Sequence, residues 1–326
     1  MRDLKELIHH RFFWPVLVGT LMLVVAGAFA LQKHLMRPVS NPPLPRAEFE
    51  AAYTRTLPPP EGRLRVYHLG HSLVGRDMPQ MLAELAGHEH ASQLGWGTSL
   101  AQHWQGPQAI FGYKDENAHP HHRLATEALA SGAYDAVIFT EMVELKDAIV
   151  YHATASHLAK WAISAREGNP DVRLYLYETW HRLDDPKGWL ERIDSDLSIL
   201  WEGEVLAGAL ANGAPPIYLI PGGQVLAAAA RAAEAGKLPE LSRREDFFAL
   251  EPSGAQDMIH LNDLGHYLIA LTHYAVLYQR SPEGLPAALS LGDGRVVAMD
   301  ADLAEALQVL VWQVVSKTPR TGITPQ

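Results

Sequence analysis

Short β-prone runs alternate with long helical stretches over most of this chain. The runs typical of strands are residues 65–70, 135–140, 172–177 and 217–220. The stretches with apolar residues at helical spacing are 79–87, 148–166, 189–210, 224–235, 263–279 and 303–315. Strands separated by helices imply right-handed crossovers and a parallel sheet that is covered on both faces. The alternation therefore predicts an α/β fold, a three-layer α/β/α sandwich.

A serine follows the first predicted strand, in the segment Gly70-His71-Ser72-Leu73. Ligands of open parallel sheets bind at the carboxyl ends of the strands, so this serine is a candidate nucleophile. At a strand-to-helix turn, we expect its backbone N–H near a helix N-terminus, where the helix dipole favours an oxyanion. Gly70 would permit the tight turn. The alternative is that Ser72 merely caps the following helix.

An acid and a histidine stand just ahead of a later predicted helix. Asp257 precedes His260 by three residues, and Asn262 or Asp263 would cap the helix that follows. A serine hydroxyl becomes a good nucleophile when an imidazole takes its proton, and the imidazole needs a partner that fixes its tautomer. Asp257 and His260 can supply both parts. The alternative is a capping turn that carries a surface histidine.

The serine after the first strand and the late Asp-x-x-His together resemble the SGNH (GDSL-like) hydrolase superfamily. The resemblance covers residues 64–280 and implies a flavodoxin-like fold. It also implies that Ser72 attacks an ester carbonyl, that His260 acts as general base and that Asp257 orients the histidine. The order along the chain, with the serine early and the Asp-x-x-His late, is also similar to the family.

One part of the family pattern is missing here. SGNH enzymes usually add oxyanion donors from a glycine after the second strand and from an asparagine after the third. The backbone donors implied here are Ser72 and Gly97, with Gly95 as the second choice. In place of the asparagine stands Glu141, and an ionised carboxylate repels an oxyanion. Glu141 is then either protonated or directed elsewhere, or another group donates.

Several further side chains have both a functional and a structural interpretation. Trp104 and Glu141 could line the substrate pocket, as could Trp180 and His181, which follow the third predicted strand. An aromatic face would suit stacking on a sugar ring, and packing in the core or rim is the alternative.

Five histidines are candidate metal ligands, and one glycine pair is a candidate phosphate-binding loop. The histidines are His88, His90, His119, His121 and His122. No carboxylate stands at a recognised ligand spacing beside them, so a solvated loop is favoured. Gly222-Gly223 lacks the lysine of a phosphate-binding loop and predicts a tight turn. We expect neither a metal nor a cofactor.

Composition excludes some classes of partner and chemistry. The formal net charge of −10 argues against nucleic acid as a partner, because binding phosphate backbones needs clustered lysine and arginine. The absence of cysteine excludes disulfides and a thiol nucleophile. The sequence does not indicate the oligomeric state.

An uncharged apolar run covers residues 12–31 near the N-terminus. About 20 apolar residues span a bilayer core, so segment 1–37 is predicted to be a transmembrane anchor, with a cleaved signal peptide as the alternative. Residues 38–62 hold seven prolines and are predicted to form a spacer with one short helix at its middle. Residues 63–326 form the SGNH-like domain.

These inferences predict a membrane-anchored serine esterase whose domain lies outside the cytoplasm, periplasmic or on the cell surface. It would hydrolyse an ester through an acyl-enzyme, and the small-molecule or glycan substrate could carry O-acetyl groups. One alternative is an O-acyltransferase that acts on an extracytoplasmic polysaccharide. The other is a non-catalytic binding module with the same fold.

Overall fold

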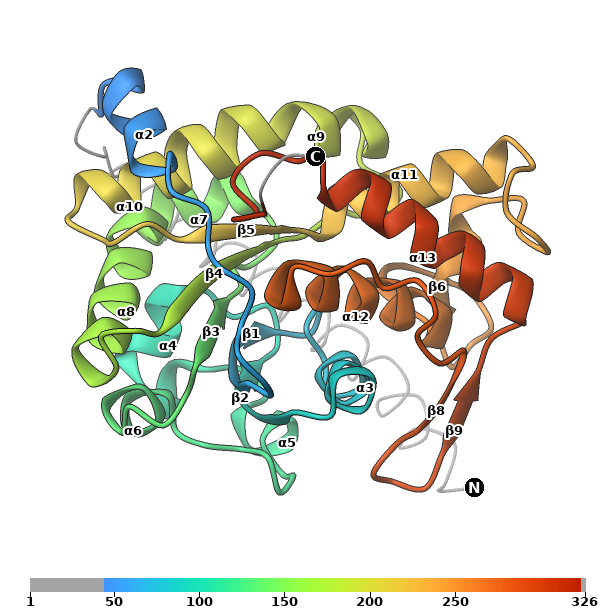
Figure 1. Ribbon diagram of the computed structural model, residues 1–326, viewed down its shortest axis with the longest axis horizontal. Helices are drawn as coiled ribbons and strands as arrows, with labels where there is room; N and C mark the ends of the chain where they lie inside the picture. The colour runs from blue at the N-terminus through green and yellow to red at the C-terminus, as the bar shows by residue number, and fades with distance from the viewer. Residues whose placement is uncertain (1–43, 324–326) are drawn as a thin grey trace, which may run out of the picture. The chain divides into compact units, whose positions relative to one another are not determined.

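A five-stranded parallel sheet forms the centre of the structure, a computed structural model that describes residues 44–323 (Figure 1). The strands lie in the order β2-β1-β3-β4-β5, and every neighbouring pair is parallel. They are β1 (Arg65–His71), β2 (Glu89–Gly95), β3 (Ala136–Phe139), β4 (Arg173–Glu178) and β5 (Tyr218–Pro221). This confirms the predicted α/β fold with a parallel sheet. The order reverses direction between β1 and β3, the place where such sheets bind ligands.

Side chains of each central strand alternate between two hydrophobic clusters, as the pleat of a strand requires. In β3, Ala136 and Ile138 belong to one cluster, and Val137 and Phe139 to the other. The first cluster is completed by α3 (Asp77–Ala86), α11 (Gly222–Glu234), α12 (Asp263–Tyr278) and α13 (Ala301–Val315). The second is completed by α4 (Leu100–Gln105), α6 (Ala125–Ala130), α8 (Thr154–Gly168) and α10 (Ala207–Ala211). Helices therefore cover both faces of the sheet.

Shorter elements complete the described chain. The helices are α2 (Arg46–Ala52), α5 (Tyr113–Glu116), α7 (Leu145–Tyr151) and α9 (Trp189–Asp196), with 3-10 turns at Pro107–Ala109 and Arg244–Phe247. Two small antiparallel pairs are β6 (Phe248–Leu250) with β7 (Gln256–Leu261), and β8 (Ala288–Ser290) with β9 (Val296–Ala298).

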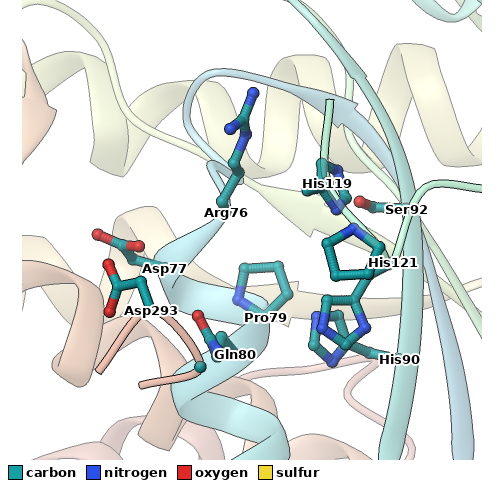
Figure 2. A pocket seen from close by; sticks show the side chains of 11 residues that line it. Arg76, Asp77, Pro79, Gln80, His90, Ser92, His119, His121 and Asp293 are labelled. Carbon is teal, nitrogen blue, oxygen red and sulfur yellow. The ribbon is translucent and has the colours of Figure 1, made fainter. Parts of the chain in front are cut away.

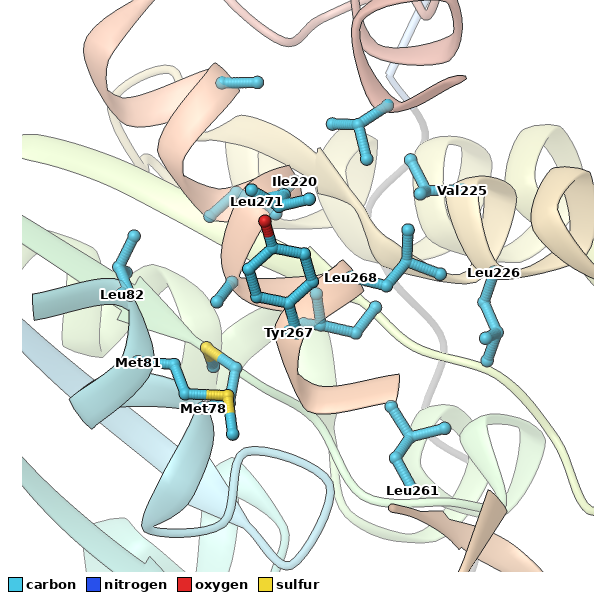
Figure 3. Packing of buried hydrophobic residues seen from close by; sticks show 14 of the residues in the cluster. Met78, Met81, Leu82, Ile220, Val225, Leu226, Leu261, Tyr267, Leu268 and Leu271 are labelled. Carbon is cyan, nitrogen blue, oxygen red and sulfur yellow. The ribbon is translucent and has the colours of Figure 1, made fainter. Parts of the chain in front are cut away.

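Helix α12 packs against both α3 and α11 within the first cluster (Figure 3). Met78 and Met81 of α3 lie beside Tyr267 of α12, and Leu268 of α12 faces α11. All four side chains are fully buried. Because α3 follows the Ser72 turn and α12 follows the strand of His260, this packing fixes the two parts of the candidate site relative to each other.

Three predictions about helices need correction. The helix expected over 148–166 is two helices, α7 and α8, because Ala153 has a positive φ of 49° between them. The helix expected over 189–210 is divided by a π-helical segment, Leu197–Leu206. Gly222 and Gly223 begin α11 instead of forming a tight turn. A Cβ on Gly222 would lie 2.3 Å from the Tyr177 ring, so glycine lets the helix approach β4 closely.

The predicted spacer is packed against the domain from residue 44 onward. The expected short helix is α2, and its Phe49 is buried in the second cluster. The Tyr53 hydroxyl donates to Ile217 O at 3.0 Å, and the Tyr218 hydroxyl donates to Arg55 O at 2.9 Å. These bonds tie the segment to β5 and to the residue before it.

The predicted anchor, with its apolar run at 12–31, lies outside the described residues. Within residues 44–323, no helix has both the length and the apolar character needed to cross a bilayer.

Candidate active site

Ser72 lies in the turn that joins β1 to α3. The backbone N–H groups of Val74 and Gly75 both donate to His71 O, at 2.9 and 3.3 Å, and close this turn. Helix α3 begins only at Asp77, so Ser72 does not cap it. Both the capping alternative and the helix N-terminus expected beside Ser72 are therefore wrong.

Gly70 serves close packing and has no positive φ. A Cβ at this position would lie 2.8 Å from Thr140 Cβ and 2.8 Å from Val74 Cγ2. Carbon atoms do not approach so closely, so only glycine lets the end of β1 meet both Thr140 and the turn after Ser72.

The structure brings together the three residues predicted as nucleophile, base and orienting acid. His260 Nε2 lies 3.1 Å from Ser72 Oγ, and His260 Nδ1 lies 2.9 Å from Asp257 Oδ2. Because a carboxylate only accepts, Nδ1 carries the proton, and Nε2 of the neutral ring is left to accept from the serine hydroxyl. The His260 side chain is 46% exposed, so a substrate can reach it.

The Asp257 carboxylate is fixed by more than the histidine ring. Its Oδ1 accepts from the backbone N–H groups of Ile259 and His260, at 2.8 and 2.9 Å. Partial burial acts to raise the pKa of Asp257, but these two bonds and the imidazole outweigh burial and hold the pKa below its usual value. Asp257 is therefore an ionised, preoriented acceptor.

Trp180 supports the strand that carries the acid and the histidine. Its indole N–H donates to Ile259 O at 2.8 Å, and the backbone N–H of Leu183 donates to Met258 O at 2.8 Å. Trp180 is 1% exposed, so neither face of its ring can stack on a sugar. Its interpretation as part of a substrate pocket is wrong, and the packing alternative is correct.

His181 belongs to a buried network of charges instead of a substrate pocket. Its Nε2 lies 3.1 Å from Asp196 Oδ2. Arg192 is the centre of the network and pairs with Glu144, Asp185 and Asp196 at 2.7, 2.9 and 2.5 Å. Burial lowers the pKa of His181, although the carboxylates oppose this. The imidazole is buried and unavailable to a substrate.

Glu141 is buried within the protein and is held by backbone N–H groups. Its Oε1 accepts from the backbone N–H of Met142 at 2.8 Å and of Leu100, the first residue of α4, at 3.2 Å. The side chain is fully buried, and burial raises its pKa to about 7 while these bonds limit the rise. Of the possibilities left open, the structure shows a carboxyl directed elsewhere. Its assignment to a substrate pocket is wrong.

Gly97 lies in the turn after β2, with a φ of 51°. The register of the sheet sets His71 opposite Gly95, so β1 and β2 end together beside Ser72. Nothing lies within 4 Å of the position that a Cβ of Gly97 would occupy, whereas a Cβ on Gly95 would lie 2.3 Å from its neighbours. The N–H groups of Gly97 and Ser72 remain the predicted oxyanion donors.

Trp104 lies on α4 and contacts α8. Its ring meets Trp161 edge-on, with centroids 4.8 Å apart, and lies 5.7 Å from the Lys160 ammonium. Trp104 is nevertheless 39% exposed. These contacts are those of a packing residue, and a role in the substrate pocket stays a prediction.

Two buried histidines near Ser72 were not predicted from the sequence to belong to the site. His71 Nε2 donates to Glu141 O at 2.8 Å, and His103 Nε2 donates to Gly70 O at 2.8 Å. Burial lowers the pKa of His71 to about 4 and that of His103 to about 3, so both are neutral at pH 7. Both hold carbonyl groups at the strand ends around the serine. Only the position of His71, next to Ser72, gave a sequence signal.

Three histidines of the considered metal set converge on a pocket (Figure 2). His90, His119 and His121 line one side of a cavity of about 280 Å³, with Asp77 and Asp293 on the opposite side. His88 lies apart from it, with its Nδ1 2.9 Å from the Tyr278 hydroxyl. His122 Nε2 lies 3.0 Å from the Tyr113 hydroxyl. The solvated-loop interpretation is therefore wrong for His88, which is buried, whereas His122 is partly exposed in a loop.

Two other groups in the described chain each place three possible ligand atoms within 4.8 Å of one another: Asp77, Asp263 and His266, and Glu144, His181 and Asp185. An arginine already supplies positive charge to each group. Arg295 lies 2.7 Å from Asp77, and Arg192 lies 2.7 Å from Glu144.

Comparisons with known proteins give a distant structural likeness. No model of a known protein family matches the chain, and no curated protein matches it either. Among solved structures, the chain is similar to a protein described as a "putative GDSL-like lipase" from Parabacteroides merdae. The identity is 13% and the TM-score 0.41, over 68% of this chain and 98% of that chain. At such values the likeness carries no argument about activity.

Proposed function

We propose that this protein is a serine esterase that acts through an acyl-enzyme. The observation that carries the proposal is the continuous chain of hydrogen-bond distances from Ser72 Oγ through His260 to Asp257. Nucleophile, base and orienting acid in this order are what covalent catalysis by a serine needs.

In the proposed reaction, His260 Nε2 removes the proton of Ser72 Oγ as the oxygen attacks the ester carbonyl. Asp257 stabilises the imidazolium that forms, because its carboxylate already accepts the proton on Nδ1. The imidazolium then gives its proton to the departing alcohol, and the acyl group remains on Ser72. A water molecule, activated by the same histidine, releases the acid. The backbone N–H groups of Ser72 and Gly97 are the proposed donors to the oxyanion.

The substrate and location are part of the proposal. The ester is an O-acyl group, such as acetyl, on a glycan outside the cytoplasm. The apolar run at residues 12–31 supports this location, because it has the length of a bilayer span. A domain anchored in this way would meet surface glycans.

A short-chain aryl ester tests the chemistry without any assumption about the alcohol. We expect turnover by the full chain, and its loss in Ser72→Ala and His260→Ala. Ser131→Ala and His157→Ala are matched controls elsewhere on the surface and should keep the rate. Equal rates in all five proteins would refute catalysis at Ser72 and leave the non-catalytic alternative. Turnover that requires an added sugar acceptor would indicate acyl transfer.

A further inference from the structure

The pocket of Figure 2 begins where the Ser72 turn ends. Arg76, the last residue before α3, lies at one end of the pocket. Its guanidinium donates to the carbonyl oxygens of Glu116, at 3.2 Å, and of Asp115. Ser72 and His260 do not themselves line the pocket, and Arg76 is the lining residue nearest to Ser72 in the chain.

Two carboxylates, Asp77 and Asp293, and two guanidinium groups, Arg76 and Arg295, set the charge of this pocket, and among residues 44–323 Arg76 donates only to backbone carbonyl oxygens. Arg295 lies 2.7 Å from Asp77 and 2.6 Å from Asp293. Burial lowers the pKa of His90 to about 3 and that of His119 to about 4, so both imidazoles are neutral at pH 7. With two carboxylates, two guanidinium groups and neutral imidazoles, the pocket has a formal net charge near zero, which favours a neutral polar ligand.

Several uncharged polar side chains of the lining can both donate and accept a hydrogen bond. A neutral imidazole offers one donor and one acceptor, and the Ser92 hydroxyl and Gln80 amide offer both as well. His119 Nε2 is buried and has no hydrogen-bond partner within the described chain, and such atoms are costly to leave unpaired. A ligand with several hydroxyl groups matches this lining, because each hydroxyl also donates and accepts.

A metal ion does not fit this arrangement. The rings of His90 and His121 are stacked, with centroids 4.1 Å apart and planes at 20°. A bound metal lies near the plane of each imidazole that ligates it, and two stacked rings cannot both direct a nitrogen at one ion. The residues considered as ligands from sequence therefore suit hydrogen bonding better than chelation.

We propose that this pocket binds a neutral sugar ring, the alcohol part of the ester that Ser72 attacks. The proposal rests on the proposed function for its link to catalysis, but binding of the sugar itself does not require turnover. The position of the pocket beyond Arg76 would present an acyl group on that ring to the serine.

Binding can be measured in the inactive Ser72→Ala chain, with a detergent that has no sugar head group. Saturation-transfer NMR with a panel of methyl hexopyranosides should show saturable binding of at least one member. Adding His119→Phe keeps a planar ring but removes both nitrogens, and should weaken binding about 3- to 10-fold, the effect of one or two hydrogen bonds. His157→Phe, in a histidine of α8 outside the pocket, is the matched control and should leave binding unchanged.

Kinetics then separate this proposal from the proposed function. In the active chain, His119→Phe should raise KM for an acetylated methyl hexopyranoside by a similar factor, whereas the control His157→Phe should leave both this KM and aryl-ester turnover unchanged. If His119→Phe folds poorly, Ser92→Ala provides a second test of sugar binding, because it removes a buried hydroxyl of the pocket. Absence of sugar binding, equal binding in all variants, or displacement of the sugar by inorganic phosphate or Zn²⁺ would overturn the proposal. None of these results depends on whether Ser72 is catalytic, which the aryl ester reports.

Discussion

Replacing Glu141 by glutamine should stabilise the protein above neutral pH. In the wild type this carboxyl is fully buried, and burial raises its pKa from 4.5 to about 7. Below pH 4.5 it is protonated in both the folded and the unfolded state. Between pH 4.5 and 7 the unfolded chain releases the proton more readily, so stability falls as the pH rises. Above pH 7 the full cost of the buried charge is present.

The expected size of this effect follows from the change in pKa. Each pKa unit is worth about 1.4 kcal/mol, so a rise from 4.5 to about 7 costs about 3 kcal/mol of unfolding free energy above pH 7. Glutamine keeps an oxygen for the N–H groups of Leu100 and Met142. Glu141 Oε2 and the Thr154 hydroxyl have no hydrogen-bond partner among the described residues, although Thr154 lies close enough to lower the pKa. The glutamine amide could donate to that hydroxyl.

Denaturant unfolding of the full chain at pH 5 and pH 8, followed by tryptophan fluorescence, measures this difference. The free energy of unfolding of Glu141→Gln should exceed that of the wild type by a margin that is roughly 2–3 kcal/mol larger at pH 8 than at pH 5. Glu127→Gln, in an exposed residue of α6, is the matched control. The reasoning fails if the gain is the same at both pH values, or if the variant is the less stable protein at pH 8.

Two further changes test the site and its support. Asp257→Asn should lower kcat for an aryl ester by roughly 10³- to 10⁴-fold, because an amide cannot hold the proton on His260 Nδ1 as a carboxylate does; unchanged kcat would contradict the assigned role. Arg192→Leu should destabilise the fold by about 3–5 kcal/mol in denaturant unfolding, since buried carboxylates lose their cation; a loss below 1 kcal/mol would show that the network is dispensable.

The central strands could be predicted because most carry continuous buried apolar runs. β2 could not, because its sequence has polar side chains with partners that only the fold supplies. Its Gln93 is buried between His103 Nδ1, at 2.9 Å, and the backbone N–H of Ala125, at 2.9 Å. His90 and Ser92 of the same strand face the pocket of Figure 2. A strand whose side chains form buried hydrogen bonds and line a cavity lacks the hydrophobic pattern by which strands are predicted.

The candidate catalytic residues could be predicted from the sequence, because each lies beside the recognisable end of a strand or the start of a helix. Ser72 follows a clear strand, and the Asp257 to His260 segment precedes a helix that Asn262 caps by accepting from Gly265 N–H at 3.0 Å. The roles of the surrounding residues could not be predicted from the sequence. Whether Trp180 faces a ligand or a backbone carbonyl depends on packing between segments far apart in the chain, and sequence spacing contains no such information.

Burial of two acids changes the electrostatic setting of the serine. Glu141 follows β3 and accepts from the first N–H of α4, and Glu178 ends β4 and accepts from the Gln224 N–H in the first turn of α11, at 3.1 Å. Helix N-termini favour such acceptors. Burial raises the pKa of Glu178 to about 8, so it is mostly protonated at pH 7.

Both acids are therefore withdrawn from the edge where a negative charge would develop during ester cleavage. Besides His260 and the ionised Asp257, the neutral imidazoles of His71 and His103 lie near this edge, and both already donate to carbonyl oxygens. Glu141 thus removes the repulsion expected from a carboxylate in the asparagine position, yet contributes no donor. Stabilisation of an oxyanion then falls to backbone N–H groups, and the open turn at Gly97 is where such a donor has space for a substrate.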